Sequence, residues 1–308
     1  MDGILALWKP RGVTSHDCVF KLRKILKTKK IGHGGTLDPD VDGILPICIG
    51  KGTKVIEYMV DSGKVYEGEI TLGFSTTTED KSGEVVNKTP VSQMIATEKI
   101  DTEMQKFVGT ITQIPPMYSA VKVNGKRLYE YARAGMEVDR PIRKAEIYSF
   151  ERLNEPVLNN ENQTLAWKFR VHCGKGTYVR TLAVDLGEKL GFSAHMSDLT
   201  RIQAAGLRQT DALSLSEVEE KMNNNTIAEF LQPIEVAIKE FPRIDLTEEL
   251  YSKVKNGMPL SKETLNIIET ADLVALFYRE KVVSLYQPHP SKEGIYKPSK
   301  VLRNQEDD

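Results

Sequence analysis

The order of apolar and polar residues in the first fifty positions predicts short strands around one amphipathic helix. Residues 3–8 form an apolar run of strand length, and Thr14 and Asp17 have the spacing of a helix-capping box. The helix that follows has an apolar face at helical spacing, formed by Val19, Leu22, Ile25 and Leu26. The glycines of residues 32–35 then predict a loop, and the apolar run 44–49 predicts a buried segment.

The middle of the chain predicts further strands and helices. Strands are predicted over 64–73, 84–86 and 164–173, and helices over 97–108, 127–134 and 178–190. Asn124-Gly125 is the strongest hairpin signal in the sequence. Thr177 is a suitable N-cap and Gly191 a suitable C-cap for the last of these helices. This mixture predicts the α+β class with a largely antiparallel sheet.

A boundary near Phe241-Pro242 divides the chain into a large and a small part. The segment beyond it predicts one helix and two strands, over 247–255, 273–278 and 282–286. A length of 308 residues agrees with about two domains, at roughly 150 residues each. We therefore expect a domain over residues 1–240 and a small, β-rich domain over residues 241–308.

The composition is that of an ordinary globular protein, with 40% hydrophobic and 28% charged residues. No run approaches the ~18 consecutive apolar residues of a membrane span. The first residues have no basic lead and no long apolar run, so no signal peptide is expected. Cys18, Cys48 and Cys173 have the spacing of neither a disulfide framework nor a zinc site. We therefore expect a cytoplasmic protein without membrane contact.

The net charge is only −1, but basic residues are concentrated in two segments. Residues 1–35 carry eight Lys or Arg against two acids, and residues 118–144 carry seven against three. Together the two segments could form a surface that binds nucleic-acid phosphates. Each segment alone is more simply interpreted as a solvated helix face.

The densest group of chemically competent residues is the Gly- and Asp-rich segment 32–43. The Asp-x-Asp-x-Asp-Gly spacing that begins at Asp38 matches the first half of an EF-hand loop, but Ile49 stands where that loop needs Glu. The glycines do not form a dinucleotide-binding motif, and Gly50-Lys51-Gly52 lacks the Ser or Thr of a P-loop. From composition alone, a tight turn is favoured over a catalytic loop.

Five motifs, in order along the chain, resemble those of the TruB-type tRNA pseudouridine synthases. They are Trp8-Lys9-Pro10-x-Gly12-x-Thr14-Ser15, Gly32-His33-Gly34-Gly35-Thr36-Leu37-Asp38-Pro39 with Gly43-Ile44-Leu45-Pro46, Tyr66 ahead of Leu72-Gly73, Pro115-Pro116-Met117-Tyr118-Ser119-Ala120 continuing to Tyr129-Glu130-Tyr131, and Lys175-Gly176-Thr177-Tyr178-Val179-Arg180. The ordered matches run from about residue 3 to 205, and Trp8 departs from the acidic residue common in the family. The C-terminal part is more weakly similar to a PUA-like RNA-binding domain.

The resemblance implies a pseudouridine synthase fold and the isomerisation of one T-loop uridine, at position 55 of tRNA. Asp38 would be the single catalytic carboxylate, as nucleophile or base at the ribose. Arg180 would keep the Asp38 carboxylate ionised and hold it in one orientation. Tyr66 would stack on the flipped uracil. The implied substrate-binding residues are Lys9, His33, Tyr178 and Leu199. Cations that contact the RNA backbone would lie on a clasping insertion over about 115–144, at Lys122, Lys126, Arg127 and Arg133.

The reaction so implied involves neither redox chemistry nor hydrolysis, so we expect no cofactor and no metal. Asp40 and Asp42 are interpreted as turn residues. The expected partner is tRNA through its T-stem-loop, and the expected oligomeric state is a monomer.

The alternative to an enzyme is a non-catalytic RNA-binding or tRNA-folding protein with the same basic surface. The combination of Asp38, Tyr66 and Arg180 favours the enzyme, because a protein that only binds RNA would not require it. Each of these residues also has an ordinary structural interpretation when considered alone. Tyr66 could be a half-buried strand residue, and Arg180 could be a surface cation in the first turn of a helix.

Overall fold

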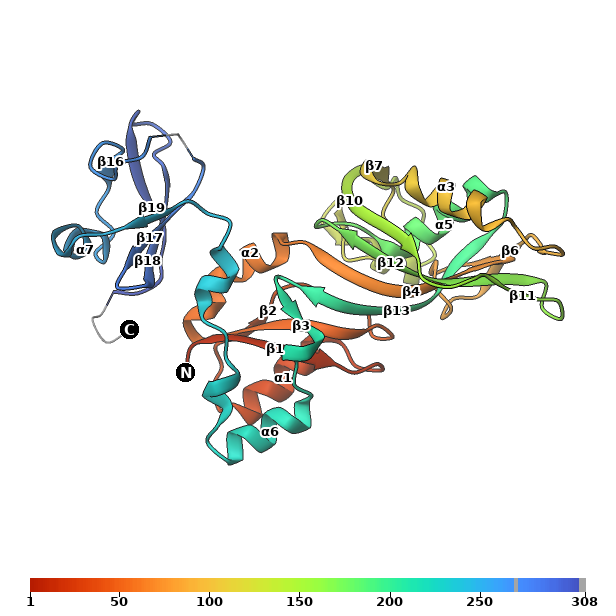
Figure 1. Ribbon diagram of the computed structural model, residues 1–308, viewed down its shortest axis with the longest axis horizontal. Coiled ribbons are helices and arrows are strands. Elements are labelled where there is room, and N and C mark those ends of the chain that lie inside the picture. The colour runs from red at the N-terminus through yellow and green to blue at the C-terminus, as the bar shows by residue number, and fades with distance from the viewer. Residues whose placement is uncertain (269–270, 305–308) are drawn as a thin grey trace.

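The computed structural model describes residues 1–268 and 271–304, whose strands form one large and one small sheet and two short hairpins (Figure 1). Ten strands of these residues form the large sheet: β1 (Gly3–Lys9), β2 (Ile31–His33), β3 (Asp42–Ile49), β4 (Lys64–Leu72), β7 (Gly109–Gln113), β10 (Arg143–Arg152), β11 (Val157–Asn159), β12 (Thr164–Cys173), β13 (Ala194–Ala204) and β14 (Leu207–Arg208). Their spatial order is β1-β3-β13-β4-β12-β10-β7, with β2 beside β3, β11 beside β12 and β14 beside β13. All pairs are antiparallel except β3 with β13.

Helices cover this sheet in two groups. The described residues contain α1 (Ser15–Ile25), α2 (Ile56–Asp61), α3 (Thr97–Gln105), α4 (Leu128–Arg133), α5 (Val179–Leu190), α6 (Leu215–Asn223) and α7 (Glu248–Val254), and 3₁₀ helices at Gly50–Val55, Gln209–Asp211, Ile227–Phe230 and Ile234–Ile238. α1 and α6 pack together against the half of the sheet that contains β1, and α3 and α5 cover the half that contains β10 and β12 (Figure 1). None of the helices in residues 1–268 and 271–304 is long and apolar enough to cross a membrane.

Each group of helices seals its own apolar core. In one core, Leu186 of α5 is fully buried with Trp167 and Phe150 of the sheet, and in the other, Leu22 of α1 is fully buried with Leu5 of β1. Burial of one such side chain contributes about 1.5–3 kcal/mol. The first core also contains Tyr66, so it anchors the strand that carries this residue.

The start of α1 is fixed by the capping box that the sequence predicts. Asp17 N donates to Thr14 Oγ1 at 3.0 Å, and Thr14 N donates to an oxygen of Asp17 at 2.9 Å. One residue later, Ser15 Oγ accepts from Leu37 N at 2.9 Å. The helix start is therefore bonded directly to the loop that carries Asp38.

The small sheet comprises β15 (Arg243–Asp245), β16 (Leu260–Ser261), β17 (Val274–Tyr278), β18 (Lys281–Pro288) and β19 (Ile295–Val301), in the order β15-β17-β18-β19-β16. The predicted helix and two strands of this region are confirmed as α7, β17 and β18. The sheet is attached to the rest of the protein by an apolar cluster that includes Phe277 and Ile234. Lys300 Nζ also pairs with Glu57 Oε1 at 2.7 Å.

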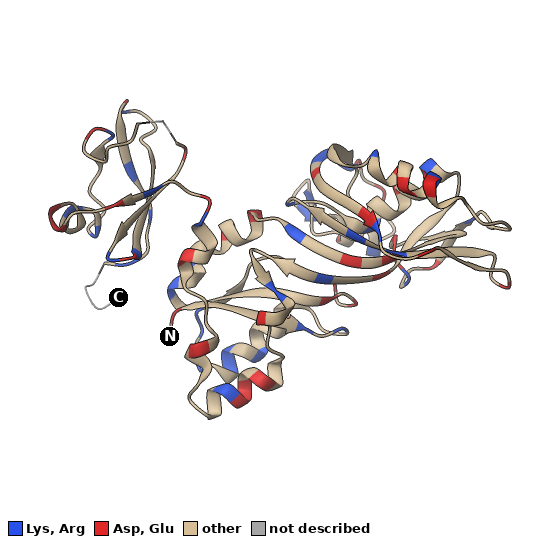
Figure 2. Cartoon of the chain, viewed as in Figure 1, with Lys and Arg blue, Asp and Glu red and all other residues tan. Residues whose placement is uncertain are grey.

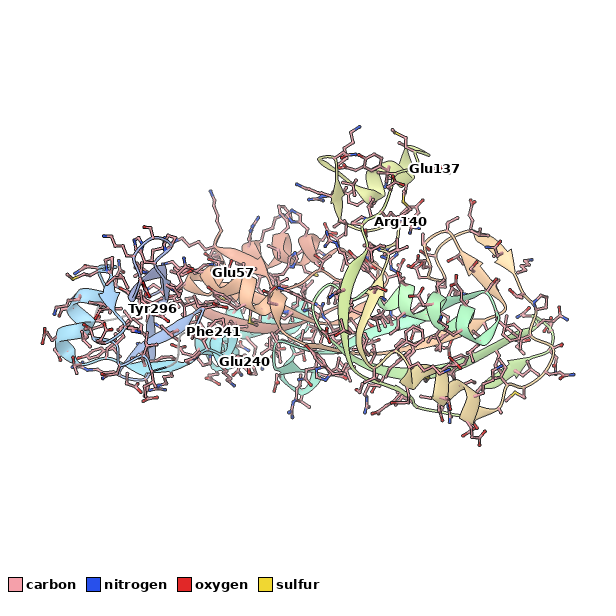
Figure 3. All side chains as sticks on the ribbon, turned by 90° about the horizontal axis from the view of Figure 1, so that it is seen from above. Glu57, Glu137, Arg140, Glu240, Phe241 and Tyr296 are labelled. Atoms are coloured by element: carbon pink, nitrogen blue, oxygen red, sulfur yellow. The ribbon has the colours of Figure 1, made fainter. Side chains whose placement is uncertain are left out.

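Two short hairpins lie outside both sheets. The first pairs β5 (Phe74–Thr76) with β6 (Val85–Lys88), and the second pairs β8 (Lys122–Val123) with β9 (Lys126–Arg127). Asn124 and Gly125 join the second pair with φ of 50° and 82°, so the predicted hairpin is confirmed. This hairpin and α4 belong to residues 114–142, which we call the insertion. It projects from the body of the protein, with Glu137 far out and Arg140 nearer the base (Figure 3).

The predicted α+β class with a largely antiparallel sheet is confirmed, but the sequence did not indicate the strands β10, β11, β13 and β14, and β2 occupies the start of the predicted loop over 32–35. β13 is the most important of these, because it joins β3 to β4. Its Thr200 and Arg201 pair in parallel with Asp42 and Gly43, and on its other side Arg201 pairs with Tyr66 of β4.

Gly43 permits this close pairing. Its φ is +116°, and a Cβ at this position would lie 2.2 Å from the carbonyl oxygen of Arg201 and 2.7 Å from its nitrogen. Both contacts are with backbone, which cannot turn aside as a flexible side chain could. Only glycine therefore fits where β3 meets β13.

We predict that Gly43→Ala lowers the free energy of unfolding by about 3 kcal/mol or more, because β3 and β13 must separate. Gly191→Ala is the matched control. Gly191 also has positive φ, at 90°, but a Cβ there would meet nothing within 4 Å, so only about 1 kcal/mol of backbone strain is expected. Urea unfolding of both variants measures the difference. Equal losses would show that the close approach at Gly43 is unimportant.

Candidate active site

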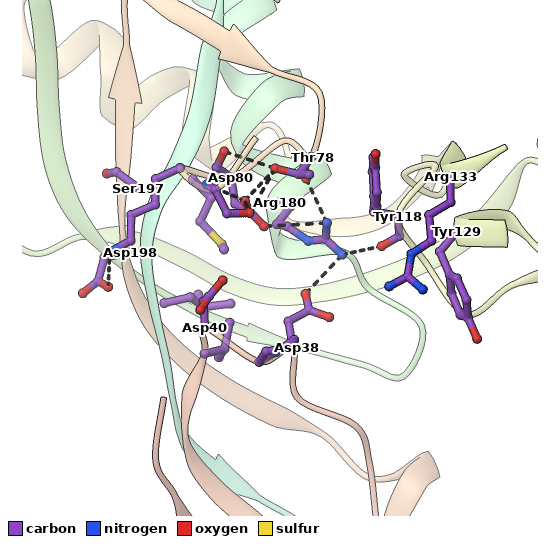
Figure 4. A pocket seen from close by; sticks show the side chains of 16 residues that line it. Asp38, Asp40, Thr78, Asp80, Tyr118, Tyr129, Arg133, Arg180, Ser197 and Asp198 are labelled. Carbon is purple, nitrogen blue, oxygen red and sulfur yellow. Dashed lines mark hydrogen bonds and ion pairs between the residues drawn. The ribbon is translucent and has the colours of Figure 1, made fainter. Parts of the chain in front are cut away.

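Asp38 and Arg180, which are far apart in the sequence, meet beside the large sheet. Asp38 Oδ2 lies 3.1 Å from Arg180 Nη2 (Figure 4). The Arg180 side chain is 8% exposed, whereas the Asp38 side chain is 48% exposed. The cation is therefore held within the protein, and the carboxylate is free to meet a ligand.

Arg180 is held in place by backbone carbonyls from two other segments. Nη1 donates to Thr78 O at 2.8 Å, and Nη2 donates to Tyr118 O at 2.9 Å. Asp80 Oδ2 lies 3.8 Å from Nη1. Asp80 was not singled out from the sequence, where it lies in an ordinary Thr-rich polar loop. The interpretation of Arg180 as a surface cation is wrong, because its side chain is buried.

The segment before Arg180 is capped differently from the prediction. Tyr178, not Thr177, is the N-cap residue of α5, and it has no side-chain cap. Thr177 Oγ1 instead donates to Gly174 O at 3.0 Å. The Gln113 side chain makes two hydrogen bonds with the backbone of Tyr178. Tyr178 N donates to Gln113 Oε1 at 2.9 Å, and Gln113 Nε2 donates to Tyr178 O at 3.1 Å. The Gln113 side chain therefore fixes the backbone of the residue that begins the helix.

Lys9 supports the Asp38 loop from beneath. Its side chain is fully buried, and Nζ donates to Val13 O at 2.7 Å, Pro10 O at 2.9 Å and Pro39 O at 3.1 Å. Burial lowers the pKa of Lys9 below its ordinary value. All three acceptors are backbone carbonyls, so Lys9 contacts the loop rather than the open space above it.

Asp38 lies between two adjoining cavities, which we call the inner and the outer cavity. The inner cavity has a volume of about 200 Å³ and is lined by Leu37, Tyr66, Ser119, Ala120 and Tyr178, among others. The outer cavity has a volume of about 320 Å³ and is lined by Thr78, Asp80, Lys81, Tyr129, Arg133 and Asp198, among others (Figure 4). Asp38, Val41, Arg180 and Leu199 line both. The structure thus brings five of the predicted residues, Asp38, Tyr66, Tyr178, Arg180 and Leu199, to one place.

Tyr66 forms part of the wall of the inner cavity. It lies on β4, and its side chain is almost completely buried. Burial raises the pKa of Tyr66, while the neighbouring Arg201 acts to lower it. The residue is therefore a neutral aromatic surface at neutral pH.

His33 is not among the residues that line either cavity. It lies on β2, opposite Ile47, and is half-buried. Among the described residues its Nδ1 atom has no hydrogen-bond partner. Burial, and after it the charge of Arg201, lowers the pKa of His33. The ring is consequently neutral at neutral pH.

The four predicted RNA-contacting cations all lie on the insertion, but only Arg133 lines the outer cavity. Arg127 and Arg133 lie over the ring of Tyr129, at 5.7 and 5.3 Å from its centre. Arg127 Nη1 also donates to Tyr129 Oη at 2.9 Å. Lys122 and Lys126 are in the exposed hairpin ahead of them. The insertion thus presents several cations and an aromatic ring near the mouth of the outer cavity.

The first basic segment reaches the same mouth through Arg11. Arg11 donates to Asp198, which lines the outer cavity, and its Nη2 lies 3.2 Å from Asp42 Oδ1. Asp42 also accepts from Thr200 Oγ1 at 2.6 Å, so it links β3 to β13 rather than forming only a turn. Elsewhere, acidic and basic residues are interspersed over most elements (Figure 2). In the described residues, no group of three or more His, Cys, Asp or Glu side chains could hold a metal ion.

Comparison with protein families gives a match over most of the chain. Residues 23–179 match the family described as TruB family pseudouridylate synthase (N terminal domain). Residues 180–239 match the tRNA pseudouridylate synthase B C-terminal domain.

Two bacterial relatives are similar over nearly their full length. The tRNA pseudouridine synthase B of Listeria innocua is 52% identical over 307 residues, which cover 99% of this chain and 100% of the relative. The enzyme of the same name from Streptococcus sanguinis is 54% identical over 302 residues, which cover 98% of this chain and 100% of the relative.

Solved structures show the same fold. A chain from the crystal structure of a Cbf5–Nop10–Gar1 complex matches with a TM-score of 0.75 and 27% identity, over 98% of this chain and 85% of that one. A chain from an H/ACA ribonucleoprotein bound to a substrate RNA containing 2′-deoxyuridine matches with a TM-score of 0.72 and 24% identity. This match covers 98% of this chain and 85% of that one. These likenesses confirm the predicted fold.

Proposed function

Because this chain belongs to the TruB family of pseudouridylate synthases, and is therefore an isomerase that forms pseudouridine in tRNA, we propose that its substrate is one uridine of the T-loop, at position 55. The five motifs that resemble this family support the assignment, as does 52% identity over 99% of the chain to a relative named tRNA pseudouridine synthase B. The position of Asp38 between two cavities is the structural observation that carries the proposed mechanism.

The uridine is flipped out of the RNA to reach Asp38. A base in folded RNA is stacked, and its ribose can approach Asp38 only when the base has left the stack. The inner cavity offers the base a place of about 200 Å³ beside the carboxylate. Tyr66 provides a flat surface on which uracil stacks, and Tyr178 and the Leu199 backbone hold the edge of the base.

The reaction itself conserves every heavy atom of the nucleotide. The N1–C1′ bond breaks, the uracil turns, and a C5–C1′ bond forms. The hydrogen on C5 leaves as a proton, and N1 ends with a proton. Asp38 acts on the ribose as nucleophile or base, and Arg180 holds its carboxylate in one orientation. Lys9 fixes the Asp38 loop through Pro39.

The remaining predicted residues hold the RNA around the flipped nucleotide. Arg133 and Tyr129 line the outer cavity, where the neighbouring nucleotides lie. Lys122, Lys126 and Arg127 extend this contact along the phosphates on the insertion. His33, half-buried at the edge of the sheet, contacts the RNA that the flipped nucleotide leaves behind. Asp38, Tyr66 and Arg180 in one place favour this enzyme over a protein that only binds tRNA.

The proposed position is tested with tRNA transcripts that carry tritium at C5 of every uracil. We expect the protein to release one tritium per tRNA, because joining through C5 displaces that hydrogen. A transcript with cytidine at position 55 should release none. Release that persists from the cytidine transcript would assign the reaction to another uridine.

The role of Asp38 predicts that Asp38→Asn lowers the rate of tritium release by roughly 10³-fold or more, since the amide keeps the shape but loses the charge. Binding of tRNA should change less than threefold. Asp40→Asn is the matched control, because Asp40 is a nearby carboxylate that also lines the outer cavity, and it should keep most of the activity. A residual rate within tenfold of the wild type in Asp38→Asn would refute the role of Asp38.

The role of the insertion predicts a change in salt dependence. Each phosphate contact in looped RNA contributes roughly −0.7 to the slope of log K against log salt. Replacing Lys126, Arg127 and Arg133 with Ala should weaken tRNA binding and make this slope shallower by about 2, with little effect on the rate at saturating tRNA. Ala at Lys99, Lys168 and Lys189, which are exposed on other elements, is the control and should leave the slope unchanged. An unchanged slope in the insertion variant would mean that its charges only face solvent.

A further inference from the structure

Arg201 is a buried cation to which the proposed mechanism gives no role. It lies in the middle of β13, and its exposure is 0%. Within residues 1–268 and 271–304, its guanidinium donates to three carbonyl oxygens of the backbone and pairs with no carboxylate. Burying a charge without a carboxylate partner is unfavourable, and an apolar residue would fill a sheet position at lower cost. A guanidinium at this point therefore indicates a task beyond packing.

The three acceptors of Arg201 flank the loop that carries Asp38. Nη2 donates to Gly35 O at 3.0 Å, and Nη1 donates to Thr36 O at 3.3 Å. Nε donates to Ile44 O at 2.8 Å. Gly35 and Thr36 precede the loop and Ile44 follows it, so one planar side chain ties both of its ends. A lysine could not do this, because its single ammonium group cannot span three separated carbonyls in fixed directions.

Arg201 also faces Tyr66. The two residues are direct partners across the β4–β13 pair, and the Arg201 charge acts to lower the pKa of Tyr66. The loop that carries Asp38 and the strand that carries Tyr66 thus both contact the Arg201 residue. Asp38 and Tyr66 both line the inner cavity.

The neighbouring Lys64 does not duplicate this role. Its Nζ donates to Val60 O and Ser62 O, both at 2.8 Å, and so secures the connection between α2 and β4. Burial, and after it the charge of Arg201, lowers the pKa of Lys64 to about 8. Of these two buried cations, Arg201 is the one that bonds to the backbone beside Asp38.

We propose that Arg201 is a positioning residue for pseudouridine formation, which clamps both ends of the Asp38 loop and keeps Asp38 at a fixed place relative to Tyr66. The inference rests on the proposed roles of Asp38 and Tyr66. It assigns Arg201 no contact with the substrate, since its guanidinium is enclosed behind the cavity.

The test compares Arg201→Met, which keeps the length without charge or donors, with Arg201→Lys, which keeps the charge. We expect Arg201→Met to lower the single-turnover rate at saturating tRNA by about 100-fold, the effect of a displaced reacting group. The dissociation constant for tRNA should change less than threefold. Arg201→Lys should lie between the wild type and Arg201→Met. Hydrogen exchange should be faster in the amides of residues 36–44 and unchanged in residues 179–190.

Arg152→Met is the control for loss of a mostly buried arginine. Arg152 bonds both oxygens of Asp101, at 2.9 and 3.0 Å, and lines neither cavity. We expect its variant to be less stable but to react within twofold of the wild-type rate.

The inference is overturned if Arg201→Met reacts within threefold of the wild type, or if its exchange rises equally in residues 36–44 and 179–190. If Arg201→Met does not fold, Arg201→Lys decides. A full rate in that variant, or its failure to fold, would make Arg201 a structural residue only. An active Asp38→Asn variant would instead refute the proposed role of Asp38, and tritium release from the transcript with cytidine at position 55 would refute the proposed substrate, so these failures are distinguishable.

Discussion

The pairing of β13 with both β3 and β4 is the contact on which the rest of this site depends. Thr200 and Asp42 are 158 residues apart, yet the hydroxyl of one donates to the carboxylate of the other at 2.6 Å. On the opposite edge of β13, Arg201 meets Tyr66. Without this strand, β3 and β4 would not be joined in one sheet, and the Asp38 loop would keep only its apolar contacts with the core that contains Tyr66, through Leu37 and Val41.

Three buried cations surround the Asp38 loop, and all of them bond to backbone carbonyls. Lys9 holds Pro39, Arg201 holds Gly35, Thr36 and Ile44, and Arg180 is itself held by Thr78 and Tyr118. Carbonyls belong to the frame of the protein and move little, so these bonds restrict the loop from several directions. Asp38 is the half-exposed group at the centre of this arrangement. Such preorganisation is what a site needs if charges are to be in place before the substrate arrives.

The site also separates two tasks in space. The inner cavity is lined by residues of the sheet, of α5 and of the first part of the insertion, and its volume is suited to a single base. The outer cavity is bordered by the insertion, whose cations and Tyr129 are suited to a longer stretch of backbone. Asp38, Val41, Arg180 and Leu199 lie between them.

Local features of the fold followed from the sequence by itself. The Thr14–Asp17 capping box, the Asn124-Gly125 hairpin and the strand of 64–73 were predicted because each depends on residues within a few positions of one another. The order of motifs also predicted site residues through their resemblance to a family, and five of these residues line the inner cavity. Their positions in the sequence could not show that Arg180 is buried.

Only the tertiary structure decided which of these residues meet. β13 was missed because its polar residues interrupt the apolar alternation, and its pairing with β4 shifts register twice. Gln113 holds the backbone of Tyr178 at the start of α5, and Asp80 lies beside Arg180, through contacts between residues 65 and 100 positions apart. Sequence patterns report the interactions of neighbours along the chain, whereas the partner of a buried charge is set by how distant strands pair.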